Sequence, residues 1–271
     1  MLLLVRYSEI GLKSTPVRRM FESQLRDNMM SMLSRDGIEA IISSAEARFF
    51  VESENLDAAA DSIRRVFGVA SVSKAELCGS DMEEICKTAA EYSRGKIKKG
   101  QSFAVKARRE GTHRYNSMDL GREAGSAIFL SNKNIKVDLT EPDVTFFIEV
   151  RNNKAYIFHE YLPGPGGLPL GCQGKVIAAV NDERGLLSAW MMMKRGCRAY
   201  VCGSYDVTLL RRYDPALKVI GEGDSVNGVL GKVMGTSLNE LDSVDASDVP
   251  LYFPTIGMSD DEVKETLRSI Y

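Results

Sequence analysis

Residues 163–185 read PGPGGLPLGCQGKVIAAVNDERG, and this stretch both divides the chain and starts its last folding unit. Prolines and glycines crowd residues 163–169, so we place a domain boundary there. The segment from Lys175 to Val180 is apolar after its first residue, which is typical of a strand buried in a parallel sheet. A helix from about Asp182 to Arg195 and a strand from Arg198 to Cys202 are expected next. This strand–helix–strand order predicts a doubly wound parallel sheet.

The remainder of residues 165–271 predicts a shortened domain of this kind. Further strands are expected at Leu217 to Ile220 and Pro250 to Phe253, and further helices at Val226 to Met234 and Ser259 to Ile270. These patterns give four strands, whereas nucleotide-binding sheets of this architecture usually have about five or six.

The first 77 residues predict a ferredoxin-like α+β domain. Ser14 or Thr15 precedes Pro16, a combination typical of a helix start. The expected order of elements is βαββαβ, which is the split-βαβ pattern. Its strands are expected at 2–6, 38–43, 48–52 and 69–76, and its helices at 16–35 and 56–67.

A second α+β unit is expected over residues 78–164. Apolar alternation and helix-start residues predict two helices and four strands, the last two strands forming a hairpin. The helices are expected at 81–94 and 117–130, and the strands at 102–107, 136–139, 144–150 and 154–160.

Composition is that of a soluble globular chain. The 271 residues are 44% hydrophobic and 27% charged, and no apolar run approaches the roughly 20 residues that a membrane helix needs. Met1 to Val5 is followed at once by Arg6, so no secretory signal is expected. Five cysteines without Cys-x-x-Cys spacing then predict free thiols and a cytoplasmic location.

Positive charge is concentrated in the middle of the chain. Between Arg94 and Arg114 there are eight Lys and Arg residues and one acid, although the whole chain has a net charge of -2. Along the strand expected here, basic and apolar residues alternate, which suits contacts with nucleic-acid phosphates. A solvated strand face is the alternative explanation. Tyr115 would either stack on an unpaired base or belong to the core. The candidate RNA-binding residues are Lys106, Arg108, Arg109, Arg114 and Tyr115.

Short motifs in the same order along almost the whole chain resemble those of the tRNA 4-thiouridine sulfurtransferases, also called thiamine-biosynthesis sulfurtransferases. They are VRYSEIGLKS at 5–14, FAVKARR at 103–109 with Gly125, VDL at 137–139, PD at 142–143, GGLPLG at 166–171, MMKRG at 192–196, GDS at 223–225 and TIGM at 255–258.

The resemblance implies three domains: a ferredoxin-like domain at 1–77, a THUMP domain at 78–164 and a PP-loop domain at 165–271. In that family the first two domains hold tRNA. The third activates a uridine with ATP so that persulfide sulfur replaces oxygen, and the same sulfur chemistry supplies the thiazole of thiamine. A cysteine desulfurase would be the sulfur-donating partner. Where the family has Lys-x-Phe-Pro, this chain has His113 to Asn116.

The chain departs from the family at the PP-loop itself. The family motif Ser-Gly-Gly-x-Asp-Ser is replaced by Asn181-Asp182-Glu183-Arg184-Gly185. Two carboxylates here would meet a polyanion, and one like-charge contact at about 4 Å costs about 4 kcal/mol at an effective dielectric of about 20. Asn181 as a helix N-cap, with acids in the first helical turn, explains the segment without a ligand. We therefore predict that ATP-dependent adenylation is lost.

An active enzyme that uses ATP and Mg²⁺ is the alternative, with Asp182 and Glu183 binding a metal ion. The candidate residues of this degenerate nucleotide site are Ala179, Val180, Asn181, Asp182, Arg212, Gly223 and Lys232. A third possibility is an adaptor that binds no RNA and acts through its acidic 239–248 loop.

Catalytic thiols and metal ligands are not evident in the sequence. Cys202 is the best-placed thiol, because ligands bind at the carboxyl ends of parallel strands, but burial in the core is the alternative for each cysteine. His113 and His159 have no partners at metal-ligand spacing, so no metal site is expected. A homodimer is the default expectation for a soluble oligomer.

Overall fold

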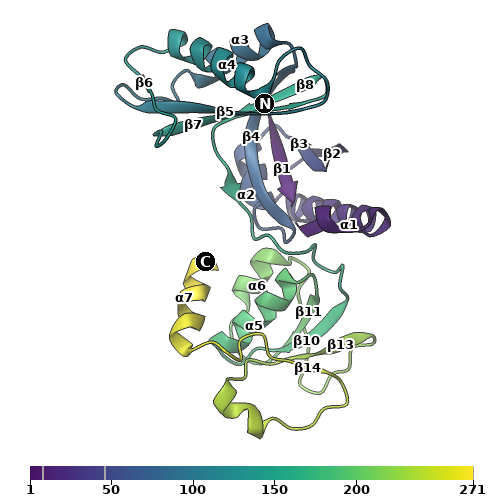
Figure 1. The fold of residues 1–271 in the computed structure, drawn as a ribbon. Coiled ribbons are helices and arrows are strands. Elements are labelled where there is room, and N and C mark those ends of the chain that lie inside the picture. Colours follow the sequence, from purple (N-terminus) through teal and green to yellow (C-terminus); the bar gives the residue numbers. More distant parts are fainter. Residues whose placement is uncertain (8, 46, 271) are drawn as a thin grey trace.

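The computed structural model describes residues 1–7, 9–45 and 47–270. Ser8, which belongs to the motif at 5–14, lies outside the described residues. The chain forms two sheets, one shared by the first two domains and one in the third (Figure 1). Within the described ranges, no helix is both long enough and apolar enough to cross a membrane.

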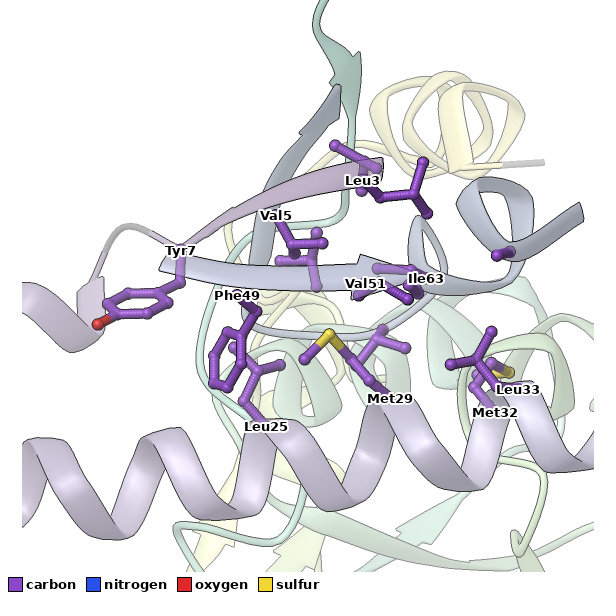
Figure 2. Close-up of a cluster of buried hydrophobic side chains, with 14 of the residues drawn as sticks. Leu3, Val5, Tyr7, Leu25, Met29, Met32, Leu33, Phe49, Val51 and Ile63 are labelled. Carbon is purple, nitrogen blue, oxygen red and sulfur yellow. The ribbon is translucent and has the colours of Figure 1, made fainter. Parts of the chain in front are cut away.

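The ferredoxin-like fold expected at the amino end is confirmed. Its elements are β1 (Leu2–Tyr7), a 3-10 turn (Glu9–Leu12), α1 (Thr15–Arg35), β2 (Ile41–Ala45), β3 (Arg48–Glu52), α2 (Leu56–Ile63) and β4 (Val69–Gly79). Strand β1 lies between β3 and β4 and is buried along its length. Figure 2 shows Leu25, Met29 and Leu33 of α1 pointing at the strands, against Val5, Phe49 and other buried side chains. Alternate positions of β1 and β3 thus face the helices, as a strand period of two requires.

Strand β4 is the structural link between the first two domains. Its first part pairs with β1, and residues 76–79 pair with β8. It passes without a break through the boundary expected between residues 77 and 78. The second domain adds α3 (Met82–Ser93), β5 (Ser102–Glu110), α4 (Ser117–Ser131), β6 (Lys136–Val137), β7 (Val144–Arg151), β8 (Lys154–Phe158) and β9 (Leu162–Pro163).

Helices α3 and α4 cover one face of the second domain's strands (Figure 1). Phe103, Phe146 and Ile148 are buried beneath them. Helix α4 begins at a capping box in which the Asn116 side chain accepts a hydrogen bond from the Asp119 amide. The opposite face of the same strands carries no helix among the described residues.

The third domain is a parallel sheet, as predicted, with strand order β12-β11-β10-β13-β14. Helices α5, α6 and α7 share one apolar core against it. The bounds are β10 (Lys175–Ala179), α5 (Glu183–Lys194), β11 (Arg198–Cys202), α6 (Thr208–Tyr213), β12 (Lys218–Val219), β13 (Val229–Val233), a 3-10 turn (Leu238–Ser243), β14 (Leu251–Tyr252) and α7 (Asp260–Ile270).

The prediction of a helix from Val226 to Met234 is wrong, because residues 229–233 form strand β13. The described sheet therefore has five strands instead of the four counted from the sequence. Gly231 has φ +159°, and its α-carbon packs so closely on the Pro250 carbonyl that a Cβ would lie 2.1 Å from that oxygen. Pairing on both sides, with β10 and β14, outweighs the helical spacing of the apolar residues.

Aromatic side chains join the third domain to the first. Phe67 follows α2 and lies in the core of the third domain. Its ring stacks on Tyr213 at 5.0 Å and meets Trp190 edge-on at 5.5 Å between centroids. The Asn28 side chain of α1 also donates to the Leu170 carbonyl. Packing at this junction therefore holds the two domains together.

Stability of the second domain should depend on the protonation of His159. Its Nδ1 lies 2.8 Å from the Tyr92 hydroxyl. Burial lowers the pKa of His159, although Glu160 partly opposes this effect. The unfolded chain therefore binds a proton more readily than the folded chain, and the free energy of unfolding should fall as the pH drops below about 6.5.

Urea denaturation at pH 7.5 and 5.5 measures this dependence. The wild type should lose more stability between the two values than His159→Gln. An equal loss in both proteins would contradict the role of this side chain.

Candidate nucleic-acid interface

The helix-free faces of the first two domains form one continuous surface, because β4 belongs to both. Pairing registers place alternate side chains of every strand on this surface. In the first domain it carries Leu2, Leu4, Arg6, Arg48 and Phe50. In the second it carries Lys106, Arg108, Phe147, Glu149, Arg151, Tyr156 and Phe158.

This surface is strongly bent between its two halves. Arg6 on β1 and Glu149 on β7 are separated by three strand spacings, about 14 Å in a flat sheet. Their side chains nevertheless meet at 2.8 Å between Nη2 and Oε1. Phe50 of the first half stacks on Tyr156 of the second at 5.1 Å between ring centroids. We call this bent surface the curved face.

At the bend, the Arg6 side chain is buried and contacts a carboxylate, a hydroxyl and two aromatic rings. It is 8% exposed, and its partner Glu149 is 6% exposed. Its Nη1 donates to the Ser73 hydroxyl at 2.9 Å, and its guanidinium lies 4.6 Å from the ring centres of Phe158 and Tyr161. Cation–π contact and two hydrogen-bonding partners offset the cost of burying this charge. Arg6 therefore braces the two domains.

Around this brace, arginines outnumber acids. The guanidinium of Arg151 donates to Glu110 at 2.7 Å and lies 3.7 Å from the second oxygen of Glu149. Burial and the neighbouring Arg151 and Arg6 lower the pKa of Arg48. The Nε of Arg48 is buried and has no hydrogen-bond partner among the described residues. Crowded cations with too few counter-charges favour a polyanion as the ligand of this face.

The basic residues predicted on β5 divide between the two faces of the sheet. Lys106 and Arg108 are exposed on the curved face. Arg109 has the opposite parity, and its Nη1 donates to the Gly111 carbonyl at 2.6 Å. Arg114 is exposed in the loop before α4.

Tyr115 is half-buried on the helix side of the second domain. It packs against the core, its hydroxyl donates to the Ser80 carbonyl, and its ring stacks on His113 at 5.3 Å. These contacts correspond to the core alternative for Tyr115.

The sequence candidates missed three arginines of the curved face, Arg6, Arg48 and Arg151, and the exposed aromatic ring of Tyr161. The Tyr161 ring is 41% exposed and packs edge-on against Phe147 and Phe158. The sequence signals for Arg6 were its place directly after the apolar residues 1–5 and in the motif at 5–14. Arg48, Arg151 and Tyr161 come together through tertiary packing that no local pattern specifies.

In the third domain, the expected nucleotide residues separate. Ala179, Cys202, Gly223 and Lys232 line one pocket of about 600 Å³ at the carboxyl ends of the strands. Arg212 lines a different groove, next to Arg64. Val180 is buried in the core, and Asn181 and Asp182 lie at the start of α5.

The start of α5 is occupied by the protein itself. Asp182, not Asn181 as predicted, is the N-cap, and its Oδ1 accepts a 2.7 Å hydrogen bond from the Gly185 amide. The Asn181 side chain instead accepts from the Ser204 amide. Gly235 packs so closely over this turn that a Cβ on it would lie 2.3 Å from the Gly185 nitrogen. The Gly185 amide, one of the groups that this helix N-terminus offers to anions, is therefore already hydrogen-bonded within the protein.

The Arg184 guanidinium points to other groups of the protein and not to the start of α5. It is buried, and it donates to the Thr255 carbonyl at 2.9 Å and to Asp260 Oδ1 at 2.6 Å. It thereby fastens α5 to the start of α7. The residues that replace the PP-loop thus hold secondary structure together, and the carboxylates of Asp182 and Glu183 oppose the binding of a triphosphate.

The cysteines are not activated by their surroundings. Burial raises the pKa of all five thiols, that of Cys172 to about 11. Cys202 donates weakly to the Ala178 carbonyl at 3.7 Å, and the nearby Lys232 only partly offsets the effect of burial. A reactive sulfur carrier needs a lowered pKa. In the part of the chain that is described, no cluster of His, Cys, Asp and Glu could hold a metal ion.

Two domain families match the sequence: the ThiI ferredoxin-like domain over residues 2–73 and the THUMP domain over residues 79–160. A tRNA sulfurtransferase of Thermoplasma volcanium is 30% identical over an alignment of 326 positions. The alignment covers 98% of this chain and 67% of that protein. A probable tRNA sulfurtransferase of Methanosarcina acetivorans is 41% identical over 201 residues, 71% of this chain and 48% of that relative. The chain spans about half the length of most of these relatives.

Solved structures share the whole arrangement. PH1313 from Pyrococcus horikoshii superimposes with a TM-score of 0.83 at 29% identity, over 99% of both chains. A 4-thiouridine synthetase, solved as an RNA complex with bound ATP, gives a TM-score of 0.81 at 22% identity over 99% of this chain and 84% of that one, which supports the fold.

A ferredoxin-like domain, a THUMP domain and a parallel-sheet domain in this order define the three-domain class related to tRNA thiolation enzymes. Within it, this chain belongs to the tRNA sulfurtransferase family.

The Arg6–Glu149 pair should contribute strongly to stability. Glu149→Gln leaves a buried guanidinium without its counter-charge, so the free energy of unfolding should fall by about 3–5 kcal/mol. Glu110→Gln is the control, because Glu110 is exposed and its ion pair should contribute at most about 1 kcal/mol. Urea denaturation of the two variants tests the difference, and equal losses would contradict a structural role for the buried pair.

Proposed function

We propose that this protein binds tRNA on the curved face and that its third domain has lost ATP-dependent adenylation. The observation that supports RNA binding best is the excess of arginine and lysine around the bend, where Arg6, Arg48 and Arg151 share a face with the exposed Lys106 and Arg108. Phosphate oxygens would supply counter-charges to the accessible cations. The relative solved with RNA and ATP supports tRNA as the polyanion.

The shape of the curved face also suits RNA. Lys106 and Arg108 are exposed on the second domain, while Arg48 lies on the first, so a backbone lying across the bend meets cations from both. Tyr161 presents an aromatic ring between them, which suits stacking of an unpaired base. We propose domain limits at 1–77, 78–164 and 165–271, with RNA recognition in the first two.

Loss of adenylation is supported by the start of α5. Asp182 accepts a hydrogen bond from the Gly185 amide, a group that could otherwise face an anion, and Gly235 packs against the Gly185 backbone. Negative charge at this turn would also repel a triphosphate. The third domain would then serve as a scaffold or partner surface.

Binding to tRNA should weaken markedly when the exposed cations of β5 are removed. For Lys106→Ala with Arg108→Ala, we expect affinity for labelled tRNA to fall at least about tenfold. The log–log salt slope should become shallower by about 1.4–1.8, because two phosphate contacts are lost. Fluorescence anisotropy at two or more salt concentrations measures both effects.

Lys87→Ala with Arg122→Ala is the matched control. It removes the same charge from the exposed side of the two helices, which lie across the sheet from the curved face. An equal loss of tRNA affinity in both double variants would mean that only the net charge of the protein matters. That result would contradict recognition by the curved face. Wild-type protein that does not bind tRNA would support the adaptor hypothesis instead.

Adenylation is tested directly by incubating the protein with tRNA and labelled ATP. We expect no tRNA-dependent release of AMP or pyrophosphate. Release of either product would establish the second candidate function, an active ATP-dependent tRNA uridine sulfurtransferase that makes 4-thiouridine and supplies sulfur to the thiamine thiazole. The sulfurtransferase names of the relatives favour that alternative.

Further proposals follow from the family and the composition. A cysteine desulfurase is the proposed partner only if sulfur transfer is retained. Five free cysteines support a cytoplasmic location. A homodimer is the proposed assembly, which sedimentation analysis would measure.

A further inference from the structure

A large groove opens at the end of the ferredoxin-like domain, at the β2 edge of the sheet, where Leu2, Ile41 and Glu52 continue the register of the curved face. Its volume is about 1420 Å³, and it is lined by the segment 36–40 after α1, the beginning of β2, the end of β3, the first two turns of α2, and Leu2 and Leu77. Neither the proposed RNA contacts nor the start of α5 belongs to it. Its charge is opposite to that of the arginines and lysines farther along the curved face.

Carboxylates form the rim of this groove. Glu39, Glu52 and Glu54 are exposed, and none of them has a side-chain hydrogen bond or ion pair in the described part of the chain. Asp61 adds a fourth exposed carboxylate, which lies 3.7 Å from Arg64. The nearest cation inside the groove, Arg65, is held by Asp36. The net potential is therefore negative, which excludes RNA and favours a cationic partner.

Apolar side chains supply anchoring positions inside this acidic rim. Ile41 is 71% exposed and Leu77 is 37% exposed, and both line the groove. A purely electrostatic surface would not need them, and at this exposure they contribute little to the fold. A partner that covers them would bury apolar area while its cations meet the rim.

The adjacent edge of the sheet offers backbone groups as well. Strand β2 is the last strand on its side and, within the described ranges, pairs only with β3 (Figure 1). Its sequence from Ile41 to Ala45 contains no lysine or proline, the residues that commonly protect such edges. An extended peptide can therefore add to β2 while its side chains alternate between solvent and the groove.

We propose that this groove and the edge of β2 bind an extended, basic segment of a partner protein, in which Lys or Arg alternates with Leu or Ile. The cations pair with Glu39, Glu52 and Glu54, and an apolar residue covers Ile41. The groove lies at the β2 edge of the sheet, whereas the exposed cations Lys106 and Arg108 lie on β5 near the other edge, so the partner and a polyanion can bind at the same time.

The probe is a fluorescein-labelled ten-residue peptide of alternating Lys and Leu, with an alternating Glu–Leu peptide as its counterpart. We expect the first to bind with salt-sensitive, micromolar affinity and the second not to bind. Glu52→Lys with Glu54→Lys should weaken binding at least tenfold. Ile41→Ser, a change at an exposed position, should weaken it severalfold.

Glu91→Lys with Glu265→Lys is the control, because both residues are exposed on helices far from the groove and the change in net charge is the same. Its peptide affinity should stay within twofold of wild type. Absence of Lys–Leu binding, or equal weakening by the two double variants, would overturn the proposal. Anisotropy with labelled tRNA provides the separate readout for the curved face: an unaltered tRNA affinity in Ile41→Ser is expected, and a parallel loss would mean that the two sites are not independent.

Discussion

The continuity of β4 is the constraint on which the first two domains depend. One strand cannot twist freely between two sheets when it supplies backbone hydrogen bonds to both, so the ferredoxin-like and THUMP domains share a single surface. The bend in that surface is held from within by Arg6 and Glu149, a pair that would be costly to bury without the hydroxyl and aromatic contacts around it. Both side-chain packing and the buried ion pair thus hold the angle between the two domains.

Charge is distributed according to this geometry. Cations collect on the curved face, where burial and the neighbouring Arg151 lower the pKa of Arg48, and carboxylates collect at the far end of the first domain. A near-neutral chain can therefore present two surfaces of opposite sign. Opposite charge at the two sites makes the encounter of a like-charged molecule with either site unfavourable.

The start of α5 shows how the protein's own side chains can use groups that a helix N-terminus offers to anions. Helix α5 has the unpaired amides that attract anions, but Asp182 satisfies one of them and Gly235 covers the turn. Arg184 then connects α5 to α7. Interactions within the protein thus use some of the groups that could otherwise face a phosphate.

The sequence by itself determined most of the element order, because apolar periodicity and glycine or proline breaks are local signals. It also predicted the alternation of Lys106 and Arg108 with apolar residues on one strand, and it contains the acidic replacement at 181–185. The error at β13 and the one-residue error at the α5 cap arose where pairing with distant strands and the close approach of Gly235 decided the outcome. Only the tertiary structure brought Arg6, Arg48 and Arg151 to one face and moved Tyr115 to the core, since register and sheet curvature join residues about 40 to 145 positions apart.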